Sequence, residues 1–467
     1  MALGRRGEQS SPMWIAATEL PRSPGHVFYR RLDRLLSDAG FDRYAEDRCR
    51  EFYAKSLGRP SIPPGVYFRM LFVGFFEGID SQRGIAWRCS DSLSIREFLG
   101  LGVADRAPDH SSLTVIRQRL PLAVYEDVFA FVLGMVESEG LLDGRTVSVD
   151  STQLEANAAM KSIVRRASGE DWRTYVKRLA VEDGEDDPDD DDARRLDRKR
   201  KKSVSNTDWE SPTDGDSRIA RMKDGRTRLA YKAEHVVDLA SDVVLAARID
   251  LADRSDASTL VESVLAADLN LARAGSETRI EEVVADKGYP AAERLTECVD
   301  LGIRTYIPER REPNRRRWGN KPDGWQAAFY ANRRRVRGQR SLWLQRLRGE
   351  HAERSIAHSC VTGGGRRTWL RGIENVRKRY TGHIVGQNLS RLMYAKFGIG
   401  TPRGLQRAAA ALLALATAAV LAPRWLRRLI TPILGLLARF IEVGRPSANI
   451  SRLEFRDSLA LSCSTGC

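Results

Sequence analysis

The sequence has few cysteines and no Cys-x-x-Cys pair, and these absences narrow the class of protein. Only six of its 467 residues are cysteines, and only Cys463 and Cys467 are near neighbours. This pattern excludes a disulfide scaffold and a zinc ribbon or finger. It is typical of reduced thiols in a cytoplasmic protein. No apolar run follows the basic N-terminal residues, so we expect no secretory signal.

Long apolar runs are also missing. Residues 66–79 contain Arg69 and Glu77, and residues 408–422 are uncharged but count only 15. A membrane-spanning helix needs about 20 residues, so we interpret both stretches as buried helices and expect no membrane role. For residues 408–422, which precede a proline and three arginines, a helix lying on a membrane surface stays open as the alternative.

Basic residues, by contrast, are abundant. The chain has 76 Lys and Arg against 62 Asp and Glu, a formal net charge of +14. Residues 303–380 hold 21 of the basic and six of the acidic residues, so this window carries the whole excess. Its arginines suit bidentate phosphate contacts, and aromatic residues lie between them. We predict a nucleic-acid-binding surface here, with Arg333, Arg334 and Arg335 as its main contacts.

Apolar spacing divides the chain into parts. Residues 1–140 are predicted to form a helical domain, with a helix over 121–139 that ends at Gly140. Residues 401–467 are expected to be a helical tail. Between them, residues 141–400 contain a charged insertion at about 165–222, in which an acidic run at 183–192 meets a basic run at 193–202. Because no apolar periodicity accompanies these runs, we expect the insertion to be largely disordered or loosely ordered.

The central part has the pattern of a mixed α/β fold. Four segments alternate or group β-branched residues as strands do, and one segment between them has helical spacing. The expected strands are 146–150, 233–238, 242–249 and 280–285, and the expected helix is 258–274. A strand order interrupted by a helix and followed by further helices indicates a mixed sheet with flanking helices.

Two of these strands end in a carboxylate. Asp150 ends the first, and Asp286 follows the last. Two carboxylates on neighbouring strands repel each other unless a cation lies between them. Mg²⁺ takes carboxylates, water and phosphate oxygens as ligands, and two such ions can act on both oxygens of a phosphoryl transfer. Asp150 and Asp286 are therefore candidate ligands for metal-dependent phosphoryl chemistry.

Five segments resemble the DDE transposases of bacterial insertion sequences in order and spacing. They are residues 147–152 (VSVDST), 231–235 (YKAEH), 285–289 (ADKGY), 352–358 (AERSIAH) and 368–375 (TWLRGIEN). The resemblance spans residues 25–400, and residues 60–79 and 108–113 are similar to the helical N-terminal domain of that family. It implies a ribonuclease-H-like catalytic core behind an all-helical N-terminal domain.

The resemblance also implies the catalytic residues. Asp150 and Asp286 match the two aspartates that hold Mg²⁺, for which Mn²⁺ can substitute, as two ions. The third carboxylate stands in Glu-x-x-Phe in relatives, and Glu353 matches it except that Ile356 replaces the aromatic residue. Glu374, followed by Lys378, is the alternative. The similarity favours Glu353.

The implied activity is cleavage at the ends of a mobile element and joining of the freed 3′ ends to target DNA. Double-stranded DNA is then the partner, and a homodimer is expected in the complex. Lys287 and Arg354 flank the carboxylates and are candidate phosphate contacts, as is Arg371, although ion pairs within the protein are an equal alternative for the first two. His110, His235 and His358 are interpreted as structural. A non-catalytic DNA-binding relative and a plain nuclease on the same fold are the competing functions.

Overall fold

The computed structural model describes residues 26–54, 61–184, 188–199, 205–310, 316–362 and 364–405. Residues up to Leu389 belong to one compact unit, and a second unit starts at Ser390. In the described part of the second unit, the Ser390 hydroxyl donates to the Gly400 carbonyl at 2.7 Å. The expected tail from 401 onwards, including the apolar stretch at 408–422, lies almost wholly outside the described residues.

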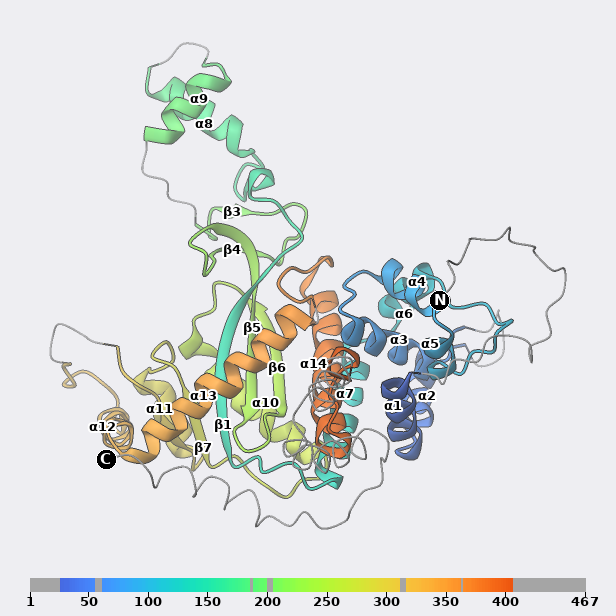
Figure 1. The fold of residues 1–467 in the computed structure, drawn as a ribbon. Helices are drawn as coiled ribbons and strands as arrows, with labels where there is room; N and C mark the ends of the chain where they lie inside the picture. The colour runs from blue at the N-terminus through green and yellow to red at the C-terminus, as the bar shows by residue number, and fades with distance from the viewer. Residues whose placement is uncertain are drawn as a thin grey trace, which may run out of the picture. The chain divides into compact units, whose positions relative to one another are not determined.

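The N-terminal part is helical, as predicted (Figure 1). Its helices are α1 (Val27–Asp38), α2 (Phe41–Cys49), η1 (Arg50–Phe52), α3 (Pro64–Glu77), α4 (Gln82–Asp91), α5 (Leu93–Phe98), α6 (His110–Arg119) and α7 (Leu122–Ser138). The apolar residues predicted at 66–79 and 121–139 form the buried helices α3 and α7. Among the described residues, no helix is long and apolar enough to cross a membrane.

Local sequence explains where α3 begins and ends. Pro64 occupies its first turn, where a missing N–H costs nothing. Gly78 ends it in the left-handed region, at φ 70°. Ten of its residues are buried, so α3 is the central helix of the N-terminal core.

One of those buried residues is charged. The Arg69 side chain on α3 is about 4% exposed and donates to Asp33 at 2.6 Å, to Asp42 at 2.9 and 2.8 Å, and to the Phe98 carbonyl at 3.0 Å. These contacts join α3 to α1, α2 and α5. A buried guanidinium is tolerated only when it is paired, so Arg69 fixes how these helices pack.

The central part is a mixed sheet. Its strands are β1 (Thr146–Glu155), β4 (Arg218–Arg221), β5 (Thr227–Asp238), β6 (Val244–Leu251), β7 (Glu282–Ala285) and β8 (Arg304–Tyr306). Along the sheet the order is β6, β5, β1, β7, β8, and β4 pairs with the first residues of β5. β1 runs antiparallel to β5 and parallel to β7, and β7 runs parallel to β8. The four predicted strands are confirmed, and β4 and β8 were not predicted. One expectation about the first strand is wrong: β1 continues to Glu155, so Asp150 lies within the strand and not at its end.

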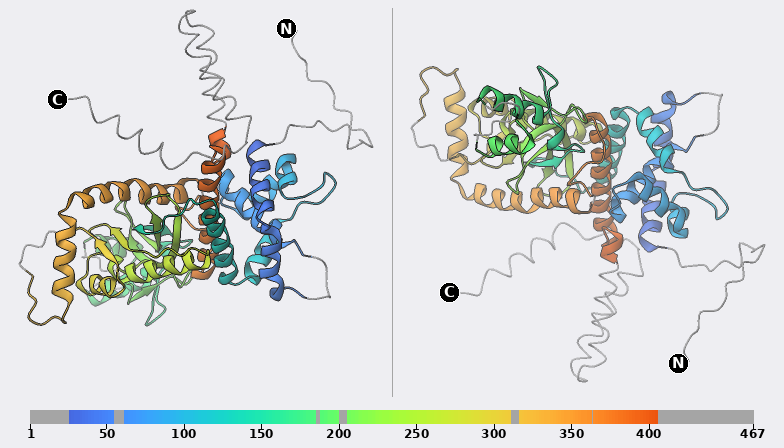
Figure 2. Two further views of the ribbon diagram at one scale, coloured as in Figure 1. Left: turned by 90° about the horizontal axis from the view of Figure 1, so that it is seen from below. Right: turned by 90° about the horizontal axis from the view of Figure 1, so that it is seen from above.

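Helices cover both faces of this sheet, as the two views in Figure 2 indicate. They are α10 (Asp256–Arg273), α11 (Ala292–Asp300), α12 (Trp325–Val336), α13 (Gln339–Ala357), the π-helical turn η3 (His358–Thr362) and α14 (Ile373–Phe397). Successive β5 residues contact different helices, because Glu234 bonds to α10 and His235 bonds to Ser355 of α13. Neighbouring side chains of a strand point to opposite faces, so α10 and α13 lie on opposite faces.

The structure corrects the prediction made for the charged insertion. Residues 165–222 are not largely disordered in their described part, which holds α8 (Trp172–Glu182), α9 (Asp190–Lys199) and the short paired strands β2 (Val164–Arg165) and β3 (Trp209–Glu210), besides β4. Trp172, Tyr175 and Trp209 pack with ring centroids 5.1–6.0 Å apart. The opposite charge runs fit α9, whose first turn is acidic and whose last turn is basic, because the helix dipole favours that order. The basic residues 200–202 lie outside the described residues.

The domain division stays a prediction. The boundary expected at 140 falls in the loop between α7 and β1. The contacts nevertheless place both sides of it in one compact unit.

Replacing Arg69 by Met should lower the free energy of unfolding by about 3 kcal/mol, because two carboxylates lose their buried partner. Urea denaturation of the purified protein measures this value. Arg88→Met is the matched control, since the Arg88–Glu77 pair is 3.5 Å long and partly exposed, and it should cost about 1 kcal/mol or less. Equal costs for the two variants would contradict the assignment of Arg69 as the organising contact.

Candidate active site

Strand register brings the two predicted aspartates together. β1 and β7 are parallel, with Val149 opposite Ala285. Asp150 and Asp286 follow this pair directly, so they are lateral neighbours at the same edge, where adjacent strands lie about 4.8 Å apart. The Asp286 charge acts on Asp150 and raises its pKa. The structure therefore brings Asp150 and Asp286 together, as the sequence predicted.

Asp150 is in a poorly solvated place. Burial is the main cause that raises the pKa of its carboxyl, and the Asp286 charge adds to it. Two contacts act in the other direction: the Ser151 N–H donates to Oδ1 at 2.8 Å, and Arg348 Nη1 lies 3.4 Å from Oδ2. The net direction is upward, so the ionised carboxylate at this position is less favourable than in water.

Asp286 is held by the turn that follows β7. The Gly288 N–H donates to its Oδ1 at 2.6 Å. A Cβ on Gly288 would come within 2.8 Å of both this oxygen and Asp256 Oδ2. Position 288 therefore has no room for a side chain, and Asp256 of α10 is a further carboxylate close to the site.

Helix α13 approaches the same edge. Its Gln345 donates to the carbonyls of Ala285 at 3.2 Å and Tyr306 at 2.8 Å, and its Arg348 reaches Asp150. Glu353, the favoured third carboxylate, lies on this helix and is exposed. The alternative Glu374 lies on α14, 63% exposed, with its carboxylate 2.8 Å from Lys378 Nζ.

The three predicted metal ligands do not form a closed site. Among the residues that the structure describes, no group of three His, Cys, Asp or Glu side chains is placed to hold a metal ion. Asp150 and Asp286 do fit a divalent cation in kind, because carboxylates are hard oxygen ligands and a cation between them would offset the Asp286 charge that acts on Asp150. Glu353 stays a predicted ligand.

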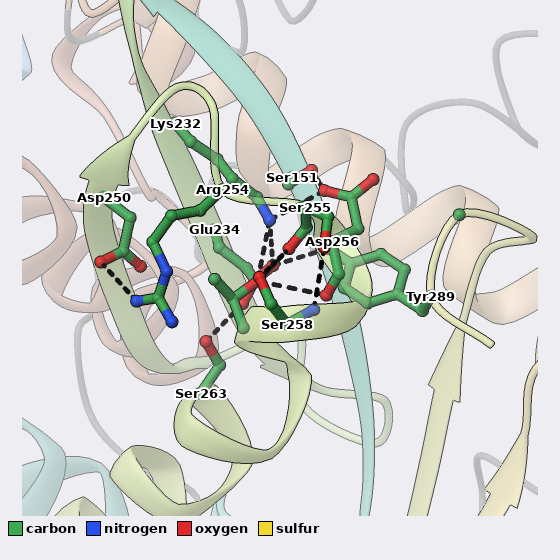
Figure 3. Close-up of polar contacts among 12 residues, drawn as sticks. Ser151, Lys232, Glu234, Asp250, Arg254, Ser255, Asp256, Ser258, Ser263 and Tyr289 are labelled. Atoms are coloured by element: carbon green, nitrogen blue, oxygen red, sulfur yellow. Dashed lines mark hydrogen bonds and ion pairs between the residues drawn. The ribbon is translucent and has the colours of Figure 1, made fainter. Parts of the chain in front are cut away.

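A buried charge network lies behind this edge, and no role was predicted for its members (Figure 3). Lys232 Nζ lies 2.8 Å from Asp256 Oδ1 and 3.2 Å from Glu234 Oε2. The side chains of Lys232 and Glu234 are 4% and 0% exposed. Thr259 accepts from Lys232 and donates to Glu234, both at 2.8 Å, and Ser263 donates to Glu234. Two signals in the sequence pointed to these residues: charged side chains within an otherwise apolar strand, and the place of Lys232 and Glu234 in the family-like segment 231–235.

The predicted DNA contacts differ in their surroundings. Arg333 forms a bidentate pair with Glu309 at 2.8 and 2.6 Å. Arg335 donates to Thr305 at 3.0 and 3.2 Å, and burial lowers its pKa. Arg334 between them is exposed. Of the three, Arg334 is thus the side chain best placed for DNA.

Of the other three predicted DNA contacts, one is paired within the protein and two are exposed. Arg354 pairs with Asp242 at 3.1 Å and with Glu350, so its structural alternative is the one observed. Lys287 and Arg371 are exposed. Lys287 directly follows Asp286, and its carbonyl accepts from Arg310 at 3.0 Å.

The histidines are structural where the contacts define them. His235 is fully buried between the Ser355 hydroxyl at 2.8 Å and the Tyr380 hydroxyl at 2.7 Å, and burial lowers its pKa to about 3. His110 lies in the first turn of α6, 3.1 Å from Asp109. His358 is exposed at the end of α13.

Comparison with protein families gives two matches. Residues 18–119 match a transposase domain, DUF772, and residues 206–395 match the transposase DDE domain. The first covers the helices α1–α6, and the second covers the sheet from β4 onward with α10–α14. Comparison with curated proteins and with solved structures gives no significant match.

The raised pKa of Asp150 predicts how stability depends on pH. A carboxyl whose pKa is higher in the folded state stabilises the fold below its unfolded pKa, about 3.9, and loses this contribution as the pH rises through the folded pKa. Asp150→Asn cannot ionise. Without divalent cations, its free energy of unfolding should exceed that of the wild type at pH 7, and the excess should vanish below about pH 4.

Urea denaturation at several pH values measures this difference. Asp109→Asn is the control of opposite sign, since the bonds from Ser111 lower the pKa of Asp109 to about 2. That variant should be less stable than the wild type at pH 7. A loss of stability at pH 7 in Asp150→Asn would show that the contact with Arg348 outweighs burial.

Proposed function

Because the chain belongs to the DDE transposases, we propose that it binds the ends of its element, cleaves them and joins the freed 3′ ends to target DNA. It acts as a homodimer on double-stranded DNA in the cytoplasm. The observation that carries this proposal is the pair of adjacent carboxylates, Asp150 and Asp286, at one edge of a ribonuclease-H-like sheet. The family supports transposition in general, and this edge is where its chemistry would take place.

The chain's own residues would work as follows. Asp150, Asp286 and Glu353 would hold two Mg²⁺ ions, or Mn²⁺, which supply activation of the attacking oxygen and stabilisation of the leaving oxygen. The backbone N–H groups of Ser151, within β1, and of Gly288, in the turn after β7, hold the two aspartates in place. The attacking group is water in the first step and the freed 3′-hydroxyl in the second.

Two positive side chains adjoin these carboxylates. Arg348 lies beside Asp150, and Lys287 is exposed next to Asp286. A scissile phosphate that enters this edge brings negative charge toward two carboxylates, so nearby cationic groups favour its approach. We assign phosphate orientation to Arg348 and Lys287.

The placement of helices supports Glu353 as the third carboxylate. Asp150 is opposite His235 in the β1–β5 pairing, so it points to the face that α13 covers. Glu353 is on α13, the helix that brings Arg348 to Asp150, although five residues place it about 140° around the helix axis from Arg348. Glu374 starts a different helix and pairs with Lys378, which gives it a structural role.

Glu353→Gln should abolish cleavage and joining, because a neutral amide is a much weaker ligand for Mg²⁺ than a carboxylate, and should leave binding to the element ends intact. Glu374→Gln is the matched control and should keep both reactions. The assay uses labelled element ends, supercoiled target DNA and Mg²⁺, with end binding followed by a mobility shift. Activity lost in Glu374→Gln and kept in Glu353→Gln would reverse the assignment. Cleavage without joining in the wild type would indicate a nuclease instead.

The DNA surface predicts a difference between adjacent arginines. Arg334→Ala should weaken binding to all DNA sequences alike and reduce the salt slope by about one unit, as the loss of one phosphate contact does. Arg333→Ala should change the slope less, since its guanidinium pairs with Glu309, and should lower stability. Fluorescence anisotropy at several salt concentrations measures both slopes. A larger slope change for Arg333→Ala would contradict this assignment.

A further inference from the structure

The network around Lys232 touches both chain segments that carry the catalytic aspartates (Figure 3). The Ser151 hydroxyl donates to Asp256 Oδ1 at 2.8 Å, while the Ser151 N–H donates to Asp150 at 2.8 Å. Ser151 therefore bonds to Asp150 on one side and to the network on the other. Its side chain can do so because neighbouring residues of β1 point to opposite faces of the sheet.

The segment after β7 is tied to the same network. Tyr289 donates its hydroxyl to Glu234 Oε2 at 2.9 Å and is 1% exposed. Its neighbour Gly288 donates its N–H to Asp286. Each catalytic aspartate thus accepts a backbone N–H that is tied to the network. For Asp150 the N–H belongs to Ser151, whose hydroxyl donates to Asp256. For Asp286 it belongs to Gly288, whose neighbour Tyr289 donates to Glu234.

Lys232 joins Asp256 and Glu234, the two carboxylates on which these contacts end. Its ammonium group lies between Asp256 and Glu234, at 2.8 and 3.2 Å. If Asp256 or Glu234 moved away, the almost fully buried Lys232 would lose one of its two carboxylate partners, which is costly. A fully satisfied buried network of this kind is rigid.

We propose that Lys232, Glu234 and Asp256 are positioning residues that fix the spacing of Asp150 and Asp286, acting through Ser151 and Tyr289. The inference rests on the proposed function, because it concerns how that site is prepared for its cations. Two carboxylates side by side repel each other, and this repulsion would spread their two segments apart. The network opposes the spreading from the face that α10 covers.

Gly288 lies between Asp256 of the network and Asp286 of the proposed site. Asp256 Oδ2 and Asp286 Oδ1 each lie 2.8 Å from the place of a Cβ at this residue. Asp256 Oδ1 accepts from Ser151 and lies beside Lys232. Asp256 thus reaches the Asp286 segment through space and the Asp150 segment through Ser151.

The test compares hydroxyl deletions inside and outside the network. Tyr289→Phe and Ser151→Ala each remove one link and keep the shape of the side chain. Tyr306→Phe is the matched control for the first, since buried Tyr306 donates to buried Glu282 at 3.1 Å. Ser148→Ala is the control for the second, because Ser148 is buried on β1 and donates to the Val237 carbonyl at 3.4 Å.

Mn²⁺ binding, followed by electron paramagnetic resonance without DNA, is the first measurement. Tyr289→Phe and Ser151→Ala should each weaken it by about tenfold or more, the usual effect of losing a group that orients a ligand. The two controls should stay within about twofold of the wild type. The Mg²⁺ concentration for half-maximal cleavage should rise in the same two variants. Circular dichroism confirms that each variant is folded.

A double variant separates positioning from direct binding by Asp256. If Asp256 acts through Ser151, Asp256→Asn with Ser151→Ala should bind Mn²⁺ no more weakly than Asp256→Asn alone. Additive losses would overturn the proposal, as would equal losses in network and control variants. If the wild type binds no Mn²⁺, or binds it equally well with Asp150→Asn, the proposed function itself fails. Normal binding in the network variants beside a loss in Asp150→Asn would reject this inference alone.

Discussion

The parallel pairing of β1 with β7 is the constraint on which the site depends. Once Val149 lies opposite Ala285, the next residue of each strand must lie at the same edge of the sheet. Both of those residues are aspartates, and water is largely kept from the first of them. The fold thus places two carboxylates that repel each other side by side, and other contacts must hold them there. Much of the surrounding polar structure can be understood as the means of doing so.

The two faces of the sheet divide this task. Asp150 and His235 face α13, which brings Arg348 and carries Glu353. The next residue pair, Ser151 and Glu234, faces α10 and contains no group assigned to the reaction. Strand alternation alone therefore separates the residues assigned to chemistry from those that hold them. It also explains why a charged pair stands in the middle of a buried strand, where an apolar residue would pack at lower cost.

The elements that could be predicted from the sequence are those with a periodic apolar pattern and those marked by residues at the ends of an apolar run. The helices over 66–79 and 121–139 and the four strands carry a local signal, and the structure has them in place. Asp150 and Asp286 are neighbours where the β1–β7 pairing ends, although β1 itself runs on to Glu155. The insertion was misjudged because α8 is short and packs two of its aromatic residues on Trp209 of β3, while ion pairs from Arg173 and Lys177 to Asp190 join it to α9. The Lys232 network could not be predicted, since its members come from β1, β5, α10 and the loop after β7. Only the tertiary fold shows that the Lys232 ammonium lies between the carboxylates of Glu234 and Asp256.

The net charge of a sequence segment is likewise a limited guide to how strongly the folded protein binds DNA. The sequence places an excess of fifteen positive charges in residues 303–380, yet several of those arginines bind acidic or carbonyl groups from elsewhere in the chain. Arg333 pairs with Glu309, Arg340 with Glu282, Arg348 with Asp150, Arg354 with Asp242 and Arg377 with Asp250. Four of these five carboxylates come from outside the window, so folding carries negative charge into it. A guanidinium already paired within the protein releases fewer counterions when it meets a phosphate. The number of phosphates that this surface neutralises is therefore set by its unpaired exposed residues, such as Arg334, and the total charge of the segment overestimates it.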